Sequence, residues 1–131
     1  MNASDREKFE ELAKKFRIHF ILLFGSKAEG KESPESDTDI AVYADHVLSE
    51  EEKINIIFEL SSILRTEKID LVDLKTASPL LKKKIFDNYK LLFVKDSFLL
   101  YQAELSALHE YEESKILREI LNERVKEFAR D

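Results

Sequence analysis

Apolar positions along this chain follow two spacings, and these predict an alternation of helices and strands. Over residues 5–16 the apolar side chains recur every three or four positions, which is typical of an amphipathic helix. Residues 18–24 form an apolar run that is too short for a typical helix and ends at Gly25, so a buried strand is predicted. The same patterns predict the next elements: a strand over 37–43, a helix over 50–65, a strand over 69–74, a helix over 79–88 and a strand over 91–94.

Capping signals mark the starts of three predicted helices. Ser49 is followed three residues later by Glu52, which is the spacing of a capping box. The same spacing between Ser4 and Glu7 predicts the start of the first helix. Ser78 precedes a proline, which fits the first helical position because it has no N–H to leave unsatisfied.

Apolar side chains at helical spacing predict the packing faces of two helices. The face expected for the helix over 50–65 consists of Ile54, Ile57, Phe58, Ser61 and Leu64. A stripe in the C-terminal segment is expected to pack on the domain and consists of Phe98, Tyr101, Leu105 and Leu108.

The segment after Ser97 has no Gly or Pro and is rich in helix-forming residues. As one helix of about 33 residues it would be roughly 50 Å long, whereas a domain of this size is about 35–40 Å across. We therefore expect the helix to project or to break, with the polar run 109–114 as the expected break. Partner binding or self-association is the alternative to packing for its last apolar residues: Leu117, Ile120, Leu121, Val125 and Phe128.

The predicted order of elements is α-β-β-α-β-α-β-α, which indicates an α+β (mixed α/β) fold. Helical connections allow parallel strand pairs, and the first two strands are expected to pair antiparallel across their loop. We expect a four-stranded mixed sheet flanked by helices over residues 1–96, followed by a C-terminal helical extension over 97–131.

Composition narrows the class of protein. With 131 residues, 44% of them apolar and 37% charged, the chain is long enough for one globular domain with a real core. Its 27 acidic and 21 basic residues give a net charge of −6, which disfavours direct nucleic-acid binding. The absence of Cys excludes disulfides and thiolate metal sites. No apolar run has the length of a signal-peptide core or a membrane span, so a reduced, cytoplasmic setting without membrane contact is expected.

The candidate chemistry lies in the stretch from Phe20 to Tyr43. Gly25 and Ser26 end one predicted strand, and a glycine followed by a hydroxyl suits close approach of a polyphosphate to the backbone. Ten residues later, Asp37 and Asp39 open the next strand. Residues two apart on a strand point to the same face, so both carboxylates lie on one side, as a divalent cation requires.

Taken together, these residues resemble the DNA polymerase β nucleotidyltransferase superfamily. The matching features are Gly25-Ser26, ten residues, Asp37-x-Asp39, and a later strand with an apolar-Asp-apolar pattern. The compact size and the Gly-Ser-Lys-Ala-x-Gly start resemble the minimal nucleotidyltransferases, and residues 71–96 with the helical tail resemble the antitoxin branch encoded beside HEPN-domain toxins.

The resemblance implies a role for each matching residue. Asp37 and Asp39 would bind Mg²⁺, with two ions expected, while Gly25 and Ser26 would hold the triphosphate of ATP. Lys27 stands where the family often has Arg; it keeps the charge but loses the bidentate geometry of a guanidinium.

A third carboxylate is implied in the apolar-Asp-apolar strand, where Asp70 and Asp73 compete. Three residues apart on a strand, they face opposite sides, so only one of them joins the site. We assign Asp70, as a metal ligand and as a candidate acceptor of the attacking hydroxyl's proton.

The resulting hypothesis is a Mg²⁺-dependent enzyme that transfers AMP from ATP to a tyrosine of a cognate HEPN RNase toxin. One alternative is an antitoxin that neutralises by binding and keeps a vestigial nucleotide site. The other is a small-molecule transferase of the aminoglycoside type, whose members generally carry additional substrate-binding structure.

Two further sets of residues are assigned no chemistry. His19, His46 and His109 are too isolated in sequence for a metal-ligand pattern. The run 82–84 consists of three lysines, for which a solvated helix face is the expected role and contact with phosphate or RNA is the alternative.

Overall fold

Helices and strands follow the predicted order in the computed structural model, which describes residues 3–30 and 36–130. The elements are α1 (Ala3–Phe16), β1 (Ile18–Phe24), β2 (Thr38–Ala44), α2 (Glu50–Leu64), β3 (Ile69–Asp73), α3 (Pro79–Asp87), β4 (Lys90–Val94) and α4 (Ser97–Arg130). The predicted loop between the first two strands begins with a turn over 26–30, and its middle, 31–35, lies outside the described residues.

The four strands form one mixed sheet in the order β3-β2-β1-β4. β1 pairs antiparallel with both β2 and β4, and β2 pairs parallel with β3. The predicted α+β fold with a four-stranded mixed sheet is therefore confirmed, as is the antiparallel pairing of the first two strands. The helix α2 provides the crossover that the parallel pair requires.

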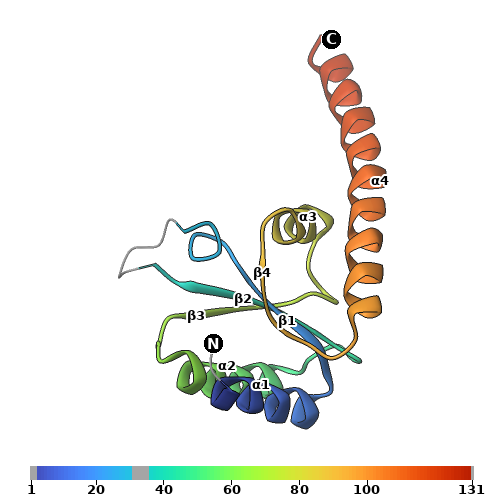
Figure 1. Cartoon of the computed structure of the whole chain (residues 1–131). Helices are drawn as coiled ribbons and strands as arrows, with labels where there is room; N and C mark the ends of the chain where they lie inside the picture. The colour runs from blue at the N-terminus through green and yellow to red at the C-terminus, as the bar shows by residue number, and fades with distance from the viewer. Residues whose placement is uncertain (1–2, 31–35, 131) are drawn as a thin grey trace.

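Each face of the sheet is covered by two helices (Figure 1). Side chains alternate along a strand, so Ile40 and Val42 of β2 join the core under α1 and α2, whereas Ala41 joins the core under α3 and α4. The first core includes Phe9 and Leu12 of α1, both almost fully buried. Asp39 precedes Ala41 by two residues and therefore lies on the α3/α4 face. The candidate site is therefore on this face of the sheet.

The capping predictions hold for two of three helices. The Glu52 N–H donates to Ser49 Oγ and the Ser49 N–H donates to Glu52 Oε1, both at 3.1 Å, so the capping box is confirmed. The Leu81 N–H donates to Ser78 Oγ at 3.2 Å. The prediction for Ser4 is wrong, because α1 begins at Ala3 and Ser4 lies within its first turn.

The two predicted packing faces are wrong for most of their residues, although Leu64 of the α2 face does pack, half-buried, against the core. In α2 the buried residues are Ile56 and Leu60, while Phe58 is 77% exposed. In α4 the predicted stripe, Phe98, Tyr101, Leu105 and Leu108, is exposed, and Leu100 and Ala107 are buried instead. Both helices carry apolar residues on two sides, and the structure buries the side with the smaller residues in α4 because a small side chain lets that helix approach α3 closely.

The predicted break at 109–114 does not occur, and α4 is one helix of 34 residues that projects beyond the domain (Figure 1). The polar run contains no helix breaker, and its side chains are satisfied on the helix surface. His109 Nε2 lies 3.0 Å from Glu113 Oε1, and Arg118 lies over the ring of Tyr111. Among the described residues, no helix has the length and apolar character needed to cross a membrane.

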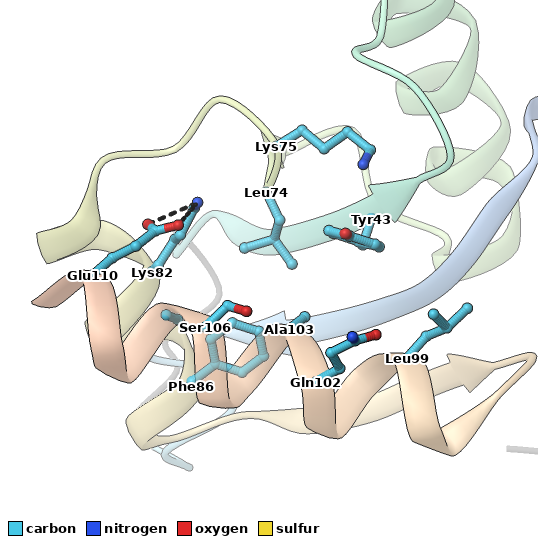
Figure 2. Close-up of a pocket in the computed structure, with 11 residues that line it drawn as sticks. Tyr43, Leu74, Lys75, Lys82, Phe86, Leu99, Gln102, Ala103, Ser106 and Glu110 are labelled. Atoms are coloured by element: carbon cyan, nitrogen blue, oxygen red, sulfur yellow. Dashed lines mark hydrogen bonds and ion pairs between the residues drawn. The ribbon is translucent and has the colours of Figure 1, made fainter.

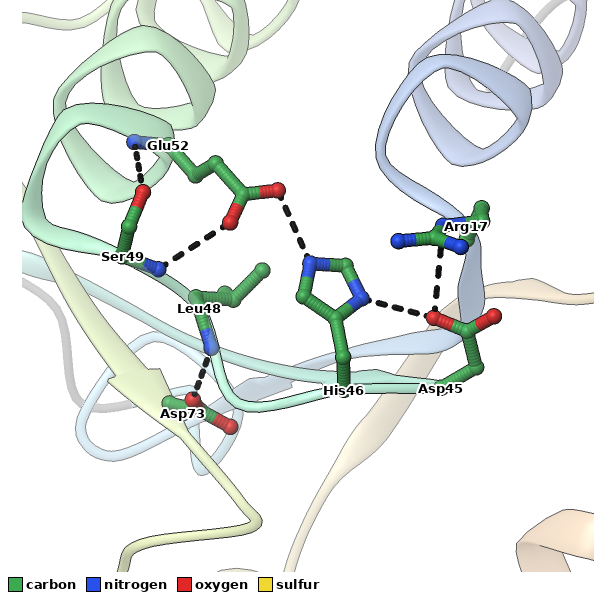
Figure 3. A network of polar contacts seen from close by, with 7 residues as sticks. All are labelled: Arg17, Asp45, His46, Leu48, Ser49, Glu52 and Asp73. Atoms are coloured by element: carbon green, nitrogen blue, oxygen red, sulfur yellow. Dashed lines mark hydrogen bonds and ion pairs between the residues drawn. The ribbon is translucent and has the colours of Figure 1, made fainter.

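A polar network fixes the connection from β2 to α2 (Figure 3). His46 Nδ1 lies 2.6 Å from Asp45 Oδ1, and His46 Nε2 lies 2.9 Å from Glu52 Oε2. Arg17 reaches Asp45 from the end of α1 at 3.5 Å. Hydrogen bonds to Asp45 and then to Glu52 raise the pKa of His46, because both stabilise the imidazolium.

We predict that the wild type has a higher free energy of unfolding than His46→Gln at low pH, and that this difference becomes smaller as pH rises. A His whose pKa is raised on folding stabilises the folded state. This stabilisation is complete below the unfolded-state pKa of about 6.5 and is lost as pH rises through the folded-state pKa. The wild type should exceed the variant most near pH 6 and least near pH 9 in urea unfolding. His109→Gln, at an exposed position on α4, is the matched control; an equal gap at both pH values would contradict the prediction.

Candidate active site

The parallel pairing of β2 with β3 brings two predicted site residues together. Asp39 and Asp70 are direct register partners, each the second residue of its strand. Register partners point to the same face of a sheet, so both carboxylates lie on the α3/α4 side. Asp37 is exposed directly before β2, two residues from Asp39. The structure therefore gathers all three predicted carboxylates at one edge of the sheet.

The pKa of Asp39 reflects its proximity to the carboxylates of Asp70 and Asp37. Partial burial raises the pKa of the Asp39 carboxyl, and the carboxylates of Asp70 and Asp37 raise it further because like charges repel. A hydrogen bond with the Asp70 side chain acts in the same direction, while the charge of Lys84 opposes it. A bound cation would relieve this accumulation of negative charge.

Asp73, the competitor of Asp70, lies on the opposite face of the sheet. It is the last residue of β3, is only 4% exposed, and accepts hydrogen bonds from two backbone N–H groups. The Leu48 N–H donates to its Oδ2 and the Lys75 N–H to its Oδ1, both at 2.9 Å. This carboxylate therefore holds the connections that follow β2 and β3, and its geometry favours Asp70 as the third member of the site.

Gly25 packs directly against the carboxylates. Its φ is +76°, and a Cβ at this position would overlap the Asp39 carboxylate. The Gly25 carbonyl accepts from the N–H groups of Ala28 at 3.1 Å and Glu29 at 3.2 Å, which closes a tight turn over Ser26. A glycine is required here because only glycine combines this backbone conformation with the close approach of Asp39.

Lys27 turns back toward β2. Its ammonium donates to the hydroxyl of Thr38, the buried first residue of β2. This contact ties the turn to the strand that carries Asp39. The roles predicted for Ser26 and Lys27 toward phosphate stay predictions.

Carboxylates of this kind match a divalent cation in donor type, because Mg²⁺ prefers oxygen ligands. The absence of a Cβ at Gly25 lets the Asp39 carboxylate lie directly against the turn that would receive the phosphates. Within residues 3–30 and 36–130, however, no three acidic or histidine side chains already stand at the spacing of a complete metal site. The residues fit the cation in donor type and charge.

Lys84 is a candidate addition to this site, although a solvated helix face is the expected role for it. Its neighbours in the lysine run are engaged elsewhere: Lys82 pairs with Glu110 at 3.1 Å and Lys83 with Asp87 at 2.6 Å. Lys84 instead acts on Asp39 electrostatically. Helical periodicity gives no signal for this, because Lys84 lies on the exposed side of α3 and only the placement of α3 over the sheet brings it near.

A cavity of about 460 Å³ lies on the same face of the sheet, between α4, α3 and the ends of β2 and β3 (Figure 2). Its lining includes Tyr43, Lys75 and Gln102 but none of the three carboxylates. Tyr43 follows Asp39 by four residues on the same face of β2, so the cavity lies further along the strands from the carboxylate edge. We place the active site at the carboxylates, because the cavity lacks a comparable donor set.

Comparison with known proteins decides the family. Residues 7–98 match the family described as Polymerase beta, Nucleotidyltransferase. The chain belongs to this family. The match covers more than half of the chain and includes every predicted site residue, so the resemblance drawn from Gly25-Ser26 and Asp37-x-Asp39 is confirmed.

Relatives of known function point in the same direction. Over 77 residues the chain is 35% identical to Protein adenylyltransferase MntA of Shewanella oneidensis, a match that spans 59% of this chain and 55% of that protein. The chain thus spans about half the length of this curated relative.

Solved structures extend the likeness to the whole fold. A chain in the crystal structure of a toxin–antitoxin with AMP-PNP is 26% identical, has a TM-score of 0.76, and is matched over 92% of this chain and 98% of its own. A chain in the structure of tri-AMPylated Shewanella oneidensis HEPN toxin in complex with MNT antitoxin is 24% identical, with a TM-score of 0.71 over 96% and 99%. The second likeness shows the fold alone.

We predict that Asp70→Asn and Asp73→Asn separate activity from stability. Asp73→Asn should lower the free energy of unfolding by about 1–3 kcal/mol, because one buried N–H loses its acceptor. Asp70 is exposed, so its substitution should change stability by less than about 0.5 kcal/mol while reducing nucleotidyl transfer by more than about tenfold.

Urea unfolding and transfer assays on both variants test this division. Full transfer activity in Asp70→Asn would show that Asp70 is not part of the active site. An unaltered unfolding curve for Asp73→Asn would contradict the structural role of that carboxylate.

Proposed function

We propose that this protein is an antitoxin that transfers AMP from ATP to a tyrosine of a cognate HEPN-domain toxin. The observation that carries the proposal is the register pairing of Asp39 with Asp70 beside Gly25, in a chain of the nucleotidyltransferase family. The relative named a protein adenylyltransferase supports a protein acceptor, and the likeness to a chain of a toxin–antitoxin solved with AMP-PNP supports a toxin partner and ATP. As part of the proposal, residues 1–96 carry the chemistry and 97–131 form an extension.

Each residue of the site has a proposed role in binding. Asp37, Asp39 and Asp70 would hold Mg²⁺, with two ions expected. The turn at Gly25 and Ser26 would receive the triphosphate through backbone N–H groups and the serine hydroxyl. Bound metal supplies Lewis-acid stabilisation of the phosphates and lowers the pKa of the attacking hydroxyl.

The transfer itself is an in-line displacement at the α-phosphorus of ATP. The tyrosine oxygen forms a new bond to phosphorus, the bond to the β-phosphate oxygen breaks, and pyrophosphate leaves. A tyrosine hydroxyl has an ordinary pKa of about 10, so its proton must be removed. Asp70 is the proposed acceptor because it is the exposed carboxylate of the register pair.

Lys84 is proposed to contact the phosphates. It already acts on Asp39 from α3, and a cation at that place would offset the negative charge of ATP. Lys27 is proposed to keep the turn closed on Thr38, with its charge directed toward the same phosphates.

We predict that incubation with ATP and Mg²⁺ adds whole AMP units to the cognate toxin, for which the protein encoded beside this one is the first to test. Intact-mass spectrometry reads the increments directly, and a variant with Asp37→Ala and Asp39→Ala is the control. An unmodified protein that still forms a complex would favour neutralisation by binding alone. A protein that is neither modified nor bound would favour a small-molecule acceptor.

We also predict that Lys84→Met lowers kcat/KM for ATP by about fivefold, since one solvent-screened charge contributes on the order of 1 kcal/mol. Lys83→Met is the matched control, because Lys83 is paired with Asp87 and should leave the value within about twofold. Equal effects of the two substitutions would assign the loss to general charge rather than to the position of Lys84.

A further inference from the structure

One face of α4 continues from the domain into the projecting half of the helix. Steps of three and four residues, the spacing of one helix face, connect Leu100, Ala103, Ala107, Glu110, Ser114, Leu117 and Leu121. The first three pack in the core shared with α3 and the sheet. The helix face that packs in the core therefore continues along the projecting half of α4, where it carries apolar side chains.

The apolar part of this face beyond the domain, here called the distal stripe, is exposed. It consists of Leu117, Ile120, Leu121, Val125 and Phe128, which are 52–79% exposed. The contacts of α4 with α3 end near Glu110 and Tyr111, which meet Lys82 and Lys83. About 19 further residues, or roughly 28 Å of helix, extend past this point.

The cavity of Figure 2 opens on the same face of α4. Its helical lining includes Ser106 and Glu110, which precede Leu117 by 11 and 7 residues and therefore share its side of the helix. Across the cavity stand Tyr43 and Lys75, with the Lys75 ammonium 4.5 Å from the centre of the Tyr43 ring. The distal stripe and the cavity thus form one continuous surface on the side of the sheet that carries Asp39.

A second copy of this chain is a poor occupant of that surface. In a parallel pair the second domain would lie at the level of the first and on the same side of α4, so the two domains would overlap. In an antiparallel pair centred on Ile120, Glu113 of one copy would face Glu127 of the other, and like charges would meet on both sides. The geometry favours a different protein that fits between the projecting helix and the domain.

We propose that the distal stripe and the cavity dock the protein that accepts the nucleotidyl group; this inference rests on the proposed function. A protein bound at this surface lies over α3, on the face of the sheet that bears the carboxylates (Figure 1). Docking on α4 orients the acceptor hydroxyl toward the active site without any contact to ATP.

Arg124 specifies part of the partner's chemistry. It lies between Leu117 and Phe128 on the helix surface, and its ion pair with Glu127 is long, at 3.8 Å. An arginine in the middle of an apolar surface pairs best with a carboxylate, bidentate where the geometry permits. The partner therefore presents an apolar surface that carries an acidic side chain opposite Arg124.

Leu121→Glu tests the docking surface, with Asn122→Glu as the matched control on the adjacent side of the helix. Binding to the protein encoded beside this one is measured by calorimetry, in variants that also carry Asp37→Ala and Asp39→Ala, so that docking is read without transfer. Leu121→Glu should weaken binding by at least about tenfold and Asn122→Glu by less than about twofold. In the active enzyme, Leu121→Glu should raise KM for the protein acceptor and leave KM for ATP unaltered.

Several outcomes would overturn the proposal. One is that Leu121→Glu binds the partner as tightly as the wild type. Another is that only Leu105→Glu loses binding, because Leu105 lies on the opposite side of α4. A wild-type dimer in sedimentation that Leu121→Glu dissociates would assign the stripe to self-association. Failure of AMP transfer with normal, Leu121-dependent binding would count against the proposed function but not against the docking surface.

Discussion

Two carboxylates stand side by side because the register of β2 against β3 places Asp39 beside Asp70. Like charges at facing positions of a sheet destabilise it by up to about 1 kcal/mol, so the pair does not set the register. The register follows from the apolar neighbours: Ile40 pairs with Leu71, and their side chains enter the core under α1 and α2. A slip of β3 by one residue would turn Leu71 out of this core and Asp70 into it, so hydrophobic burial under α1 and α2 holds the charges together.

Much of the fold was predictable because local signals and tertiary packing agree. A short apolar run followed by glycine fixes β1, and the capping box at Ser49 fixes the start of α2. The helix phases were not predictable in the same way. Both α2 and α4 have apolar residues on two sides, and periodicity does not say which side faces the sheet. The structure buries Ile56 rather than Phe58 in α2, and Ala107 rather than Leu105 in α4.

The candidate site was predictable to the extent that it depends on strand alternation and motif spacing. Alternation separates Asp70 from Asp73, and the structure finds them on opposite faces of the sheet. The hydrogen bond from Leu48 to Asp73 joins residues 25 positions apart and has no local signal. The same holds for Lys84, whose effect on Asp39 depends on where α3 sits over the sheet.

Continuity of α4 has a consequence for how firmly its parts are held. Up to Tyr111 the helix is supported by α3 and the sheet, so opening it requires disruption of a core. Beyond that residue it is held by its own backbone bonds and by pairs such as Lys126 with Glu123, without the tertiary packing that supplies most helical stability in proteins. The free energy of local opening should therefore fall along a single unbroken helix, and its last five turns gain full order from whatever covers them.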